Sequence, residues 1–458
     1  MLQNAPHLTR VLQFVIPCFS CWEAIYYSVG LKLYDWLSGK AILSRSFFMS
    51  RLESLLRVPQ LKCHDLFGAA VYVDGQFDDA RYNLALIRSC LAAGGDVLNY
   101  ASVTGFTTDR EGRLVTAEVE ERWSAMRFPV RAKVFLNATG PFSDRLRQMA
   151  SPDVAPRLTL SRGVHIVLPL PADFPNYAIV IPRTEDDRLI FAIPWQGRLL
   201  VGTTETETTI EDERTVTKSE AEYLLRHLNR YLARTFDRSE IVSAMAGLRP
   251  LVKSSKSSDP RKLIRDYEIE VEPRSTLISV LGGKWTVYRA MAEEAIDVVQ
   301  RRLAGRISEC RTRRHPLFGF ENQRDQAVQN LMEIHKIPAD VISHLLDKFG
   351  NCAAQVLELA REDSSLAARL VPGAPQIRAE VVYSVREEMA VSIEDVLSRR
   401  LGLQLFDWRL AIQAAPMVGN ILARELGWTR SRTEEEVRLY IDQIRTSLYA
   451  LGLDLVPA

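Results

Sequence analysis

An apolar run that ends in two consecutive glycines and leads straight into a helical pattern constrains this chain more than any other feature. The run covers Thr276–Leu281, is rich in β-branched and apolar residues, and is typical of a buried strand. Gly282 and Gly283 follow it, and Lys284–Arg289 opens the helix. Glycines let a backbone approach a ligand closely, and the N–H groups at a helix start attract an anion or an electron-rich ring edge. The sequence therefore predicts a strand–turn–helix binding element here.

Composition places the chain among ordinary globular proteins and excludes several classes. Its 458 residues are 47% apolar and 25% charged, which suits two or three domains with a large core. The net charge of +1 does not indicate general binding to nucleic acid, so any specificity for anions must come from a local site. Six scattered cysteines do not suggest a disulfide framework, and Cys18 and Cys21 lack the second pair that a zinc site needs. We predict a reducing compartment and no metal.

Residues 1–65 are predicted to form a helical, aromatic-rich segment. The uncharged run Val11–Trp22 is shorter than the roughly 18 to 20 residues that span a bilayer, and Pro17 interrupts it. A signal peptide does not fit either, because Glu23 rather than a small-residue cleavage site follows. The aromatic continuation is compatible with a helix lying in a membrane interface. A buried helical hairpin is the alternative.

From residue 66 to 310 short strand patterns alternate with helical ones, and the predicted fold class is mixed α/β (α/β with α+β character). A strand is expected at Gly68–Val73, a turn at Asp74–Gly75, a helix from about Asp79 to Ala93, and another strand at Asp96–Tyr100. The Gln196–Gly197 turn is expected to join two strands as a hairpin. After residue 310 the pattern becomes helical, so a separate α-helical domain is predicted at 316–458.

Several further blocks occur in the order expected of one family. They are Tyr26–Asp35, Asp74–Leu84, Asn137–Asp144, Gly163–Val167, Pro194–Trp195 with Gly202–Thr206, Gly247–Leu251, the double-glycine element and Ser392–Arg400. Together they resemble the FAD-dependent glycerol-3-phosphate dehydrogenases from about Tyr26 to Ile444. The resemblance implies an FAD/NAD(P)-binding-like flavoprotein fold at 66–310, with flavin and strand-rich substrate parts interleaved, followed by the helical domain.

The resemblance also implies roles for particular residues. FAD is expected beside Thr139, Gly140, Gly282, Gly283, Lys284, Trp285 and Thr286. The substrate phosphate is expected at Arg249 and Arg265, since guanidinium groups suit phosphate oxygens. Lys284 would lie between flavin and substrate and stabilise developing negative charge. His165 is a candidate general base for the C2 hydroxyl, although a lone histidine in a strand is more often structural.

The reaction implied is oxidation of sn-glycerol 3-phosphate to dihydroxyacetone phosphate, with electrons passed to a quinone. The family begins with a βαβ unit carrying G-x-G-x-x-G, yet this chain has no G-x-G, so its Met1 is expected to correspond to a point downstream of that unit. A non-catalytic remnant that acts as an interaction protein, and an oxidase that uses oxygen, are the alternatives. Peripheral membrane contact, at a bacterial cytoplasmic face or a mitochondrial inner membrane, and a homodimer also stay open.

Overall fold

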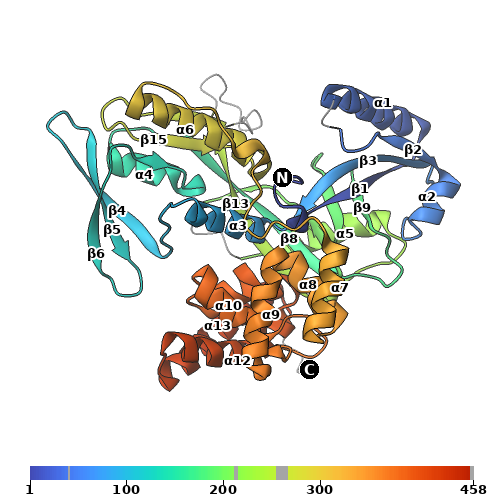
Figure 1. Cartoon of the computed structure of the whole chain (residues 1–458). Coiled ribbons are helices and arrows are strands. Elements are labelled where there is room, and N and C mark those ends of the chain that lie inside the picture. The colour runs from blue at the N-terminus through green and yellow to red at the C-terminus, as the bar shows by residue number, and fades with distance from the viewer. Residues whose placement is uncertain (40–41, 211–214, 254–266, 454–458) are drawn as a thin grey trace.

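A large mixed sheet organises the molecule. The computed structural model describes residues 1–39, 42–210, 215–253 and 267–453. Within them the strand order is β12-β8-β11-β10-β9-β1-β3-β2, and β13 pairs with β8 (Figure 1). The strands are β1 (Thr9–Cys18), β2 (Phe47–Ser50), β3 (Gly68–Phe77), β8 (Leu158–Pro169), β9 (Tyr177–Ile181), β10 (Ile190–Trp195), β11 (Arg198–Gly202), β12 (Thr206–Glu207) and β13 (Ser243–Val252).

The first strand corrects the prediction of a helical segment at 1–65. Residues 9–18 form β1, which pairs antiparallel with β3 and parallel with β9 in the middle of the sheet. Val15 is buried on one face and Phe14 on the other, so both faces are covered and the strand reads as a continuous apolar run. That run has no period-2 alternation to distinguish it from a helix. Helices do follow, α1 (Cys21–Ser38) and α2 (Arg51–Arg57).

Two smaller sheets complete the first part of the chain. One has the order β14-β15-β7 and the other β4-β5-β6. Helices α4 and α6 both pack against β15, while α5 packs on the large sheet (Figure 1). The bounds are α3 (Asp79–Ala92), β4 (Ala101–Thr108), β5 (Leu114–Glu121), β6 (Arg127–Arg131), β7 (Leu136–Asn137), η3 (Gly140–Phe142), α4 (Ser143–Ala150), α5 (Lys218–Tyr231), β14 (Tyr267–Val271), β15 (Ile278–Gly282), η6 (Trp285–Val287) and α6 (Tyr288–Ala304).

Some of the local predictions from the sequence are confirmed by these elements, and others are wrong. The helix predicted at Asp79 and the hairpin at Gln196–Gly197 are confirmed. The turn predicted at Asp74–Gly75 is wrong, because both residues stay paired with β1 to the end of β3. The strand predicted at Asp96–Tyr100 is also wrong, since pairing begins only at Ala101. Pairing between strands decides both cases, with the distant β1 in the first and with the neighbouring β5 in the second.

The C-terminal part is helical, as the sequence predicts. It lies below the large sheet in Figure 1, on the opposite side from α1. Its helices are α7 (Arg324–His335), α8 (Ala339–Phe349), α9 (Ala353–Glu362), α10 (Arg378–Glu388), α11 (Leu403–Phe406), α12 (Trp408–Leu426) and α13 (Arg430–Ala450). Their buried side chains join those of the sheet in one core, so the predicted boundary at 316 separates two regions that pack together. No helix among the described residues is both long and apolar enough to cross a bilayer.

Candidate functional site

One face of the large sheet carries the chemically important side chains. Val164 and Ile166 of β8 point into the core and are fully buried. Because side chains alternate along a strand, Gly163 and His165 lie on the other face. Cross-strand pairing places Gly202 opposite His165. The same register places Arg249 of β13 opposite Ser161 of β8 and hence on the His165 face. Three strands distant in sequence thus assemble the predicted base and the predicted phosphate ligand.

His165 is held as a neutral imidazole against a glycine. A methyl group added at Gly202 would lie 2.2 Å from the His165 ring, so the glycine makes room for it. Burial, with a smaller contribution from the nearby Arg249 cation, lowers the pKa of His165 to about 4. Within the described residues the ring has no hydrogen-bond partner. A neutral imidazole with free nitrogens is able to accept a proton.

Arg249 is oriented by the turn that follows β11. Its Nη2 donates to Thr203 Oγ1 at 2.8 Å, and its Nη1 donates to the Thr204 carbonyl at 3.3 Å. The guanidinium also lies against Gly163, where a Cβ would be 2.6 Å from Nη2. Thr204 is fixed in turn, because its hydroxyl accepts from the Val164 N–H at 3.1 Å. The Arg249 guanidinium is therefore held in position before any ligand binds.

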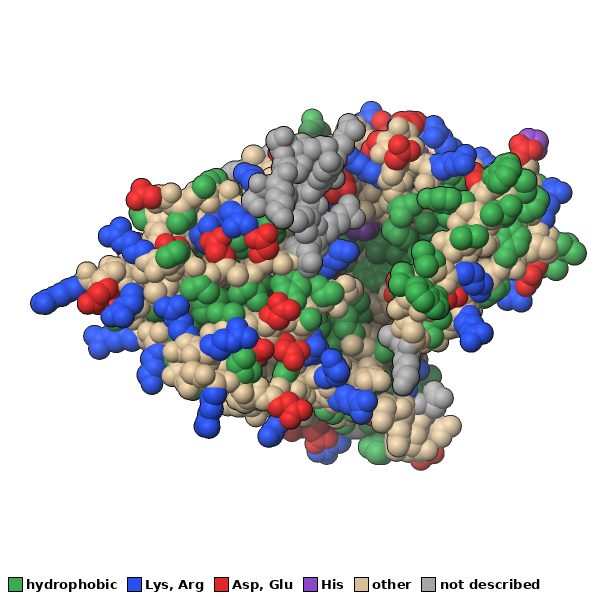
Figure 2. All heavy atoms as spheres, turned by 90° about the horizontal axis from the view of Figure 1, so that it is seen from above, with side chains coloured by type: hydrophobic (Ala, Val, Ile, Leu, Met, Phe, Trp, Pro, Cys, Tyr) green, Lys and Arg blue, Asp and Glu red, His purple; other side chains and the backbone are tan. Residues whose placement is uncertain are grey.

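Apolar and aromatic groups continue the same face toward the N-terminal strands. Phe14 stacks on Tyr72 with ring centroids 5.1 Å apart and meets Phe191 edge-on at 6.1 Å. Phe191 is the cross-strand partner of Gly202, which ties this cluster to the His165 face. Seen from above, the surface is hollowed between the α1 part and the α6 part, and apolar side chains line the hollow (Figure 2). Burial raises the pKa of Tyr72, so its hydroxyl stays protonated.

The glycine turns predicted to approach FAD lie at one end of a sheet. Strands β7 and β15 are parallel, with Asn137 beside Ser279, so the turns that follow them leave the same edge. Gly140, Gly282 and Gly283 all have positive φ, of 56°, 70° and 90°. These backbone conformations favour glycine. The structure thus brings Thr139–Gly140 and Gly282–Gly283 together.

Asn137 fixes the first of these turns. Its side-chain amide donates to the Ser143 carbonyl at 3.0 Å and to Ser279 Oγ at 3.2 Å. Its carbonyl oxygen accepts from the Thr139 hydroxyl at 2.7 Å. The buried amide therefore ties the turn to both β15 and α4. The sequence pointed to this turn as a whole, but it gave the Asn137 side chain no separate role, because its burial and its partners appear only in the structure.

The residues after the double glycine are largely exposed. Lys284 and Thr286 are exposed, and Trp285 is 37% exposed. The Trp285 ring contacts Tyr82 of α3 and Tyr288 of α6, with centroids 6.4 and 5.4 Å away. This aromatic cluster was not predicted, because its members come from separate segments. It attaches the start of α6 to α3.

Strand β13 connects the residues predicted to bind substrate with the residues predicted to bind FAD. Segment η3, which contains Gly140, contacts both β13 and β15. Leu281 of β15 packs with Val252 of β13 and Leu158 of β8. The double glycine therefore lies beside the strand that carries Arg249. Arg265, the second predicted phosphate ligand, lies outside the described residues.

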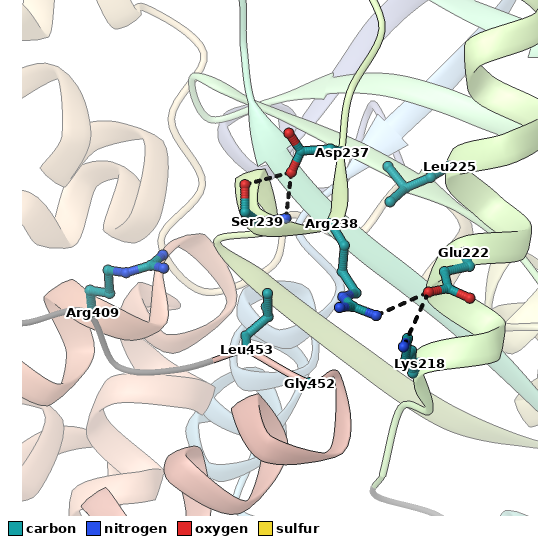
Figure 3. Close-up of a pocket in the computed structure, with 9 residues that line it drawn as sticks. All are labelled: Lys218, Glu222, Leu225, Asp237, Arg238, Ser239, Arg409, Gly452 and Leu453. Atoms are coloured by element: carbon teal, nitrogen blue, oxygen red, sulfur yellow. Dashed lines mark hydrogen bonds and ion pairs between the residues drawn. The ribbon is translucent and has the colours of Figure 1, made fainter.

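One cavity lies apart from the predicted site residues. It has a volume of about 640 Å³ between α5, the start of α12 and the end of the helical part, and contains none of the predicted site residues (Figure 3). Lys218 and Arg238 share the Glu222 carboxylate there, at 3.8 and 2.9 Å. Among the described residues no cluster of His, Cys, Asp or Glu could hold a metal ion.

Comparisons with known proteins agree with this geometry. Residues 14–343 match the family model described as FAD dependent oxidoreductase, and residues 310–433 match the C-terminal domain of alpha-glycerophosphate oxidase. A probable mitochondrial glycerol-3-phosphate dehydrogenase of Caenorhabditis elegans is 34% identical over 96% of this chain, and the chain spans 62% of that protein. The mitochondrial glycerol-3-phosphate dehydrogenase of Arabidopsis thaliana is 33% identical, with 96% and 72% covered.

A solved structure supports the same relationship. The glycerol-3-phosphate dehydrogenase of Bacillus halodurans complexed with FAD is 27% identical, with a TM-score of 0.81 over 100% of this chain and 85% of that one. The predicted flavoprotein fold is thereby confirmed. The C-terminal match begins at residue 310, within the region where the sequence changes to helices.

The described residues fit one half of FAD. The two positive-φ glycine turns and the start of α6 permit the close backbone approach that a flavin ring requires. A dinucleotide pyrophosphate, in contrast, is held by a glycine-rich loop between a strand and a helix. The 458 residues contain no G-x-G, so the glycine turns that follow β7 and β15 do not have the sequence of that loop. The glycine turns after β7 and β15 therefore suit the flavin half, and the sequence contains no G-x-G loop of the kind that binds a pyrophosphate.

Proposed function

This chain belongs to the FAD-dependent oxidoreductase family and to its glycerol-3-phosphate dehydrogenases, and from that membership we propose that it oxidises sn-glycerol 3-phosphate to dihydroxyacetone phosphate. The observation that carries the proposal is the pairing of a neutral imidazole with an oriented guanidinium on one sheet face. A polyol phosphate needs both groups, one for its hydroxyl proton and one for its phosphate.

Arg249 is the proposed phosphate ligand. Its guanidinium fork matches phosphate oxygens in bidentate geometry, and its contacts with Thr203 and Thr204 limit the entropy lost on binding. We propose Arg265 as a second cation for the same phosphate. Together they would favour a dianionic substrate over glycerol itself.

His165 is the proposed general base. Burial lowers its pKa to about 4, so the imidazole is unprotonated at neutral pH but a weak base, and its role as acceptor of the C2 hydroxyl proton is proposed from its place on the Arg249 face. When bound, FAD supplies the two-electron acceptor for the hydride that leaves C2. Lys284 is exposed beside the glycine turn and would offset negative charge there. The proton thus goes to the protein and the hydride to the cofactor.

A quinone in the bilayer is the proposed electron acceptor, reached through peripheral contact by α1 and α2. Helix α1 exposes an apolar stripe in which Trp22 is 76%, Val29 64% and Trp36 76% accessible. Leu52 and Leu56 of α2 are 70% and 74% accessible. Large aromatic side chains on the exposed face of a helix suit the interface between headgroups and acyl chains.

Flotation with phosphatidylcholine vesicles tests this contact. Trp22→Ser/Trp36→Ser is expected to abolish flotation, whereas Tyr449→Ser, which removes an 83% exposed aromatic on α13, is expected to leave it unchanged. Ubiquinone reduction in those vesicles, set against oxygen uptake, separates a dehydrogenase from an oxidase. Equal flotation of all three proteins would show that α1 does not bind the membrane.

The visible absorption spectrum of the purified chain, after FAD is supplied and excess removed, tests the activity itself. Retained flavin that bleaches with glycerol 3-phosphate supports the proposal, and Arg249→Lys is expected to raise the substrate concentration needed about tenfold or more. A second candidate, a non-catalytic interaction protein, is favoured by the missing G-x-G. Retained flavin that never bleaches, or bleaching that Arg249→Lys leaves unaltered, would contradict the assigned roles.

A further inference from the structure

The cavity between the large sheet's helix α5 and the helical part has no role in the function proposed above. Its volume of about 640 Å³ lies within the roughly 300 to 1,000 Å³ that is typical of small-molecule sites. Its walls come from α5, from η4 (Arg238–Glu240), from the start of α12 and from residues 452–453 after α13 (Figure 3). Side chains from four separate segments therefore converge on one space.

Three cations line this cavity. Lys218 Nζ and Arg238 Nη1 approach the same oxygen of Glu222, at 3.8 and 2.9 Å, so one carboxylate serves both cations. Among the described residues, Arg238 Nε is buried and has no hydrogen-bond acceptor. Arg409 lies on the other side of the cavity, and within the described part of the chain its guanidinium has no hydrogen-bond or ion-pair partner (Figure 3). These N–H donors are available to an anion.

The acidic side chains of the cavity do not balance its cations. Besides Glu222, Asp237 is the other carboxylate that lines it. The Asp237 carboxylate accepts from the hydroxyl and the N–H of Ser239 within its own turn, and these bonds lower its pKa. Two carboxylates against three cations leave an excess of positive charge. Leu225, which is 5% exposed, and Leu453 add apolar surface to the same walls.

We propose that this cavity binds a small phosphate monoester. Its phosphate oxygens accept from Arg409, Arg238 and Lys218, since guanidinium and ammonium groups suit phosphate. Its organic part lies against Leu225 and Leu453. None of the described residues predicted to bind substrate or FAD lines this cavity, so the proposal does not depend on the proposed activity.

The walls of the cavity are attached to strands of the large sheet. Helix α5 packs against β8, β9, β10 and β11. Trp408, next to Arg409, donates its N–H to the Val242 carbonyl at 2.9 Å, directly before β13 begins. A phosphate monoester that bridges α5, η4 and α12 would therefore tie the helical part to the strands that carry His165 and Arg249. Its binding free energy would stabilise the folded chain.

Calorimetric titration of the full chain with phenyl phosphate, at constant ionic strength, tests the site. This probe has a phosphate monoester and an apolar ring but no hydroxyl to oxidise. Arg409→Gln is expected to raise its dissociation constant about tenfold or more, because a charge-assisted hydrogen bond is lost. Arg424→Gln is the matched control, since Arg424 is on the same helix, is 71% exposed and does not line the cavity. It should leave the constant within about twofold of the wild-type value.

Thermal unfolding separates lost binding from lost structure. Without ligand, Arg409→Gln should melt at the wild-type temperature, because the Arg409 side chain has no partner among the described residues. Phenyl phosphate at about 100 times its dissociation constant should raise the melting temperature of the wild type by about 3 °C. The same concentration should raise that of Arg409→Gln by less.

Two further comparisons identify the site and the ligand class. Binding of phenyl phosphate that survives Arg249→Lys supports a separate site, whereas binding that Arg249→Lys abolishes would assign the probe to the substrate phosphate and overturn the proposal. Inorganic phosphate should bind about tenfold more weakly, because it lacks the apolar ring. Equal binding of the free ion would overturn the assignment to an ester. No binding of phenyl phosphate in the millimolar range, or equal constants for Arg409→Gln and Arg424→Gln, would overturn the site.

Discussion

Neutralising Glu388 is expected to destabilise the contact between α3 and the helical part severely. Arg81 donates from Nη1 and Nη2 to the two Glu388 oxygens, each at 2.8 Å. Its Nε donates to the Lys348 carbonyl at 2.9 Å, and the guanidinium lies 4.3 Å from the centre of the Phe349 ring. The Arg81 and Glu388 side chains are only 7% and 3% exposed. Water therefore cannot replace a lost partner.

The burial sets the size of the effect. Removing one member of a buried, fully hydrogen-bonded pair typically costs about 3 to 5 kcal/mol, because the remaining charge stays desolvated. Arg81→Met and Glu388→Gln should each lower the free energy of unfolding by an amount in this range. The double variant Arg81→Met/Glu388→Met should cost far less than the sum, since no unpaired charge remains.

Arg88 and Glu387 provide a matched control on the same two helices. Arg88 Nη2 lies 2.9 Å from Glu387 Oε2, but the Glu387 side chain is 48% exposed. An exposed pair contributes about 0 to 1 kcal/mol, so Glu387→Gln should barely change the unfolding free energy. Urea titration followed by tryptophan fluorescence measures all four proteins. Equal costs for Glu387→Gln and Glu388→Gln, or additive costs in the double variant, would refute the reasoning from burial.

Three further outcomes are expected. In Gly163→Ala the new Cβ would lie 2.6 Å from Arg249 Nη2, so the guanidinium should move by about 0.8 Å to reach an ordinary contact of 3.4 Å. Calorimetry should then show a dissociation constant for glycerol 3-phosphate that is about tenfold higher. An unchanged constant would count against Arg249 as the phosphate ligand. The pKa of His165 is about 4 in the folded chain and about 6.5 in the unfolded chain, so the free energy of unfolding should fall by about 3 kcal/mol as the pH drops from 6.5 through 4. Urea titrations at several pH values should show a weaker pH dependence for His165→Gln. The same pH dependence in both proteins would contradict this. Gly350→Ala should lower the free energy of unfolding by about 3 kcal/mol, because the new Cβ would lie 1.7 Å from the Gly319 carbonyl oxygen and residue 350 has a φ of 56°. A variant as stable as the wild type would show that the backbone can move to accommodate the methyl group.

Elements with a complete local signal could be predicted from the sequence. The helix at Asp79 has an Asp78 cap and a regular apolar spacing, and the Gln196–Gly197 turn supplies positive φ at both residues. The double glycine after Thr276–Leu281 specifies strand, turn and helix in succession. Each of these depends on contacts within a few residues. The family resemblance likewise followed from the printed residues alone.

The tertiary structure decided what depends on distant partners. Residues 9–18 are a strand because β3 and β9 flank them, and their apolar run alone fits a helix equally well. His165 and Arg249 lie on the same face because cross-strand register sets which side of the sheet each occupies, and one residue of slip would reverse it. Local spacing fixes the turn that can approach a cofactor, whereas pairing across the sheets fixes which side chains meet there.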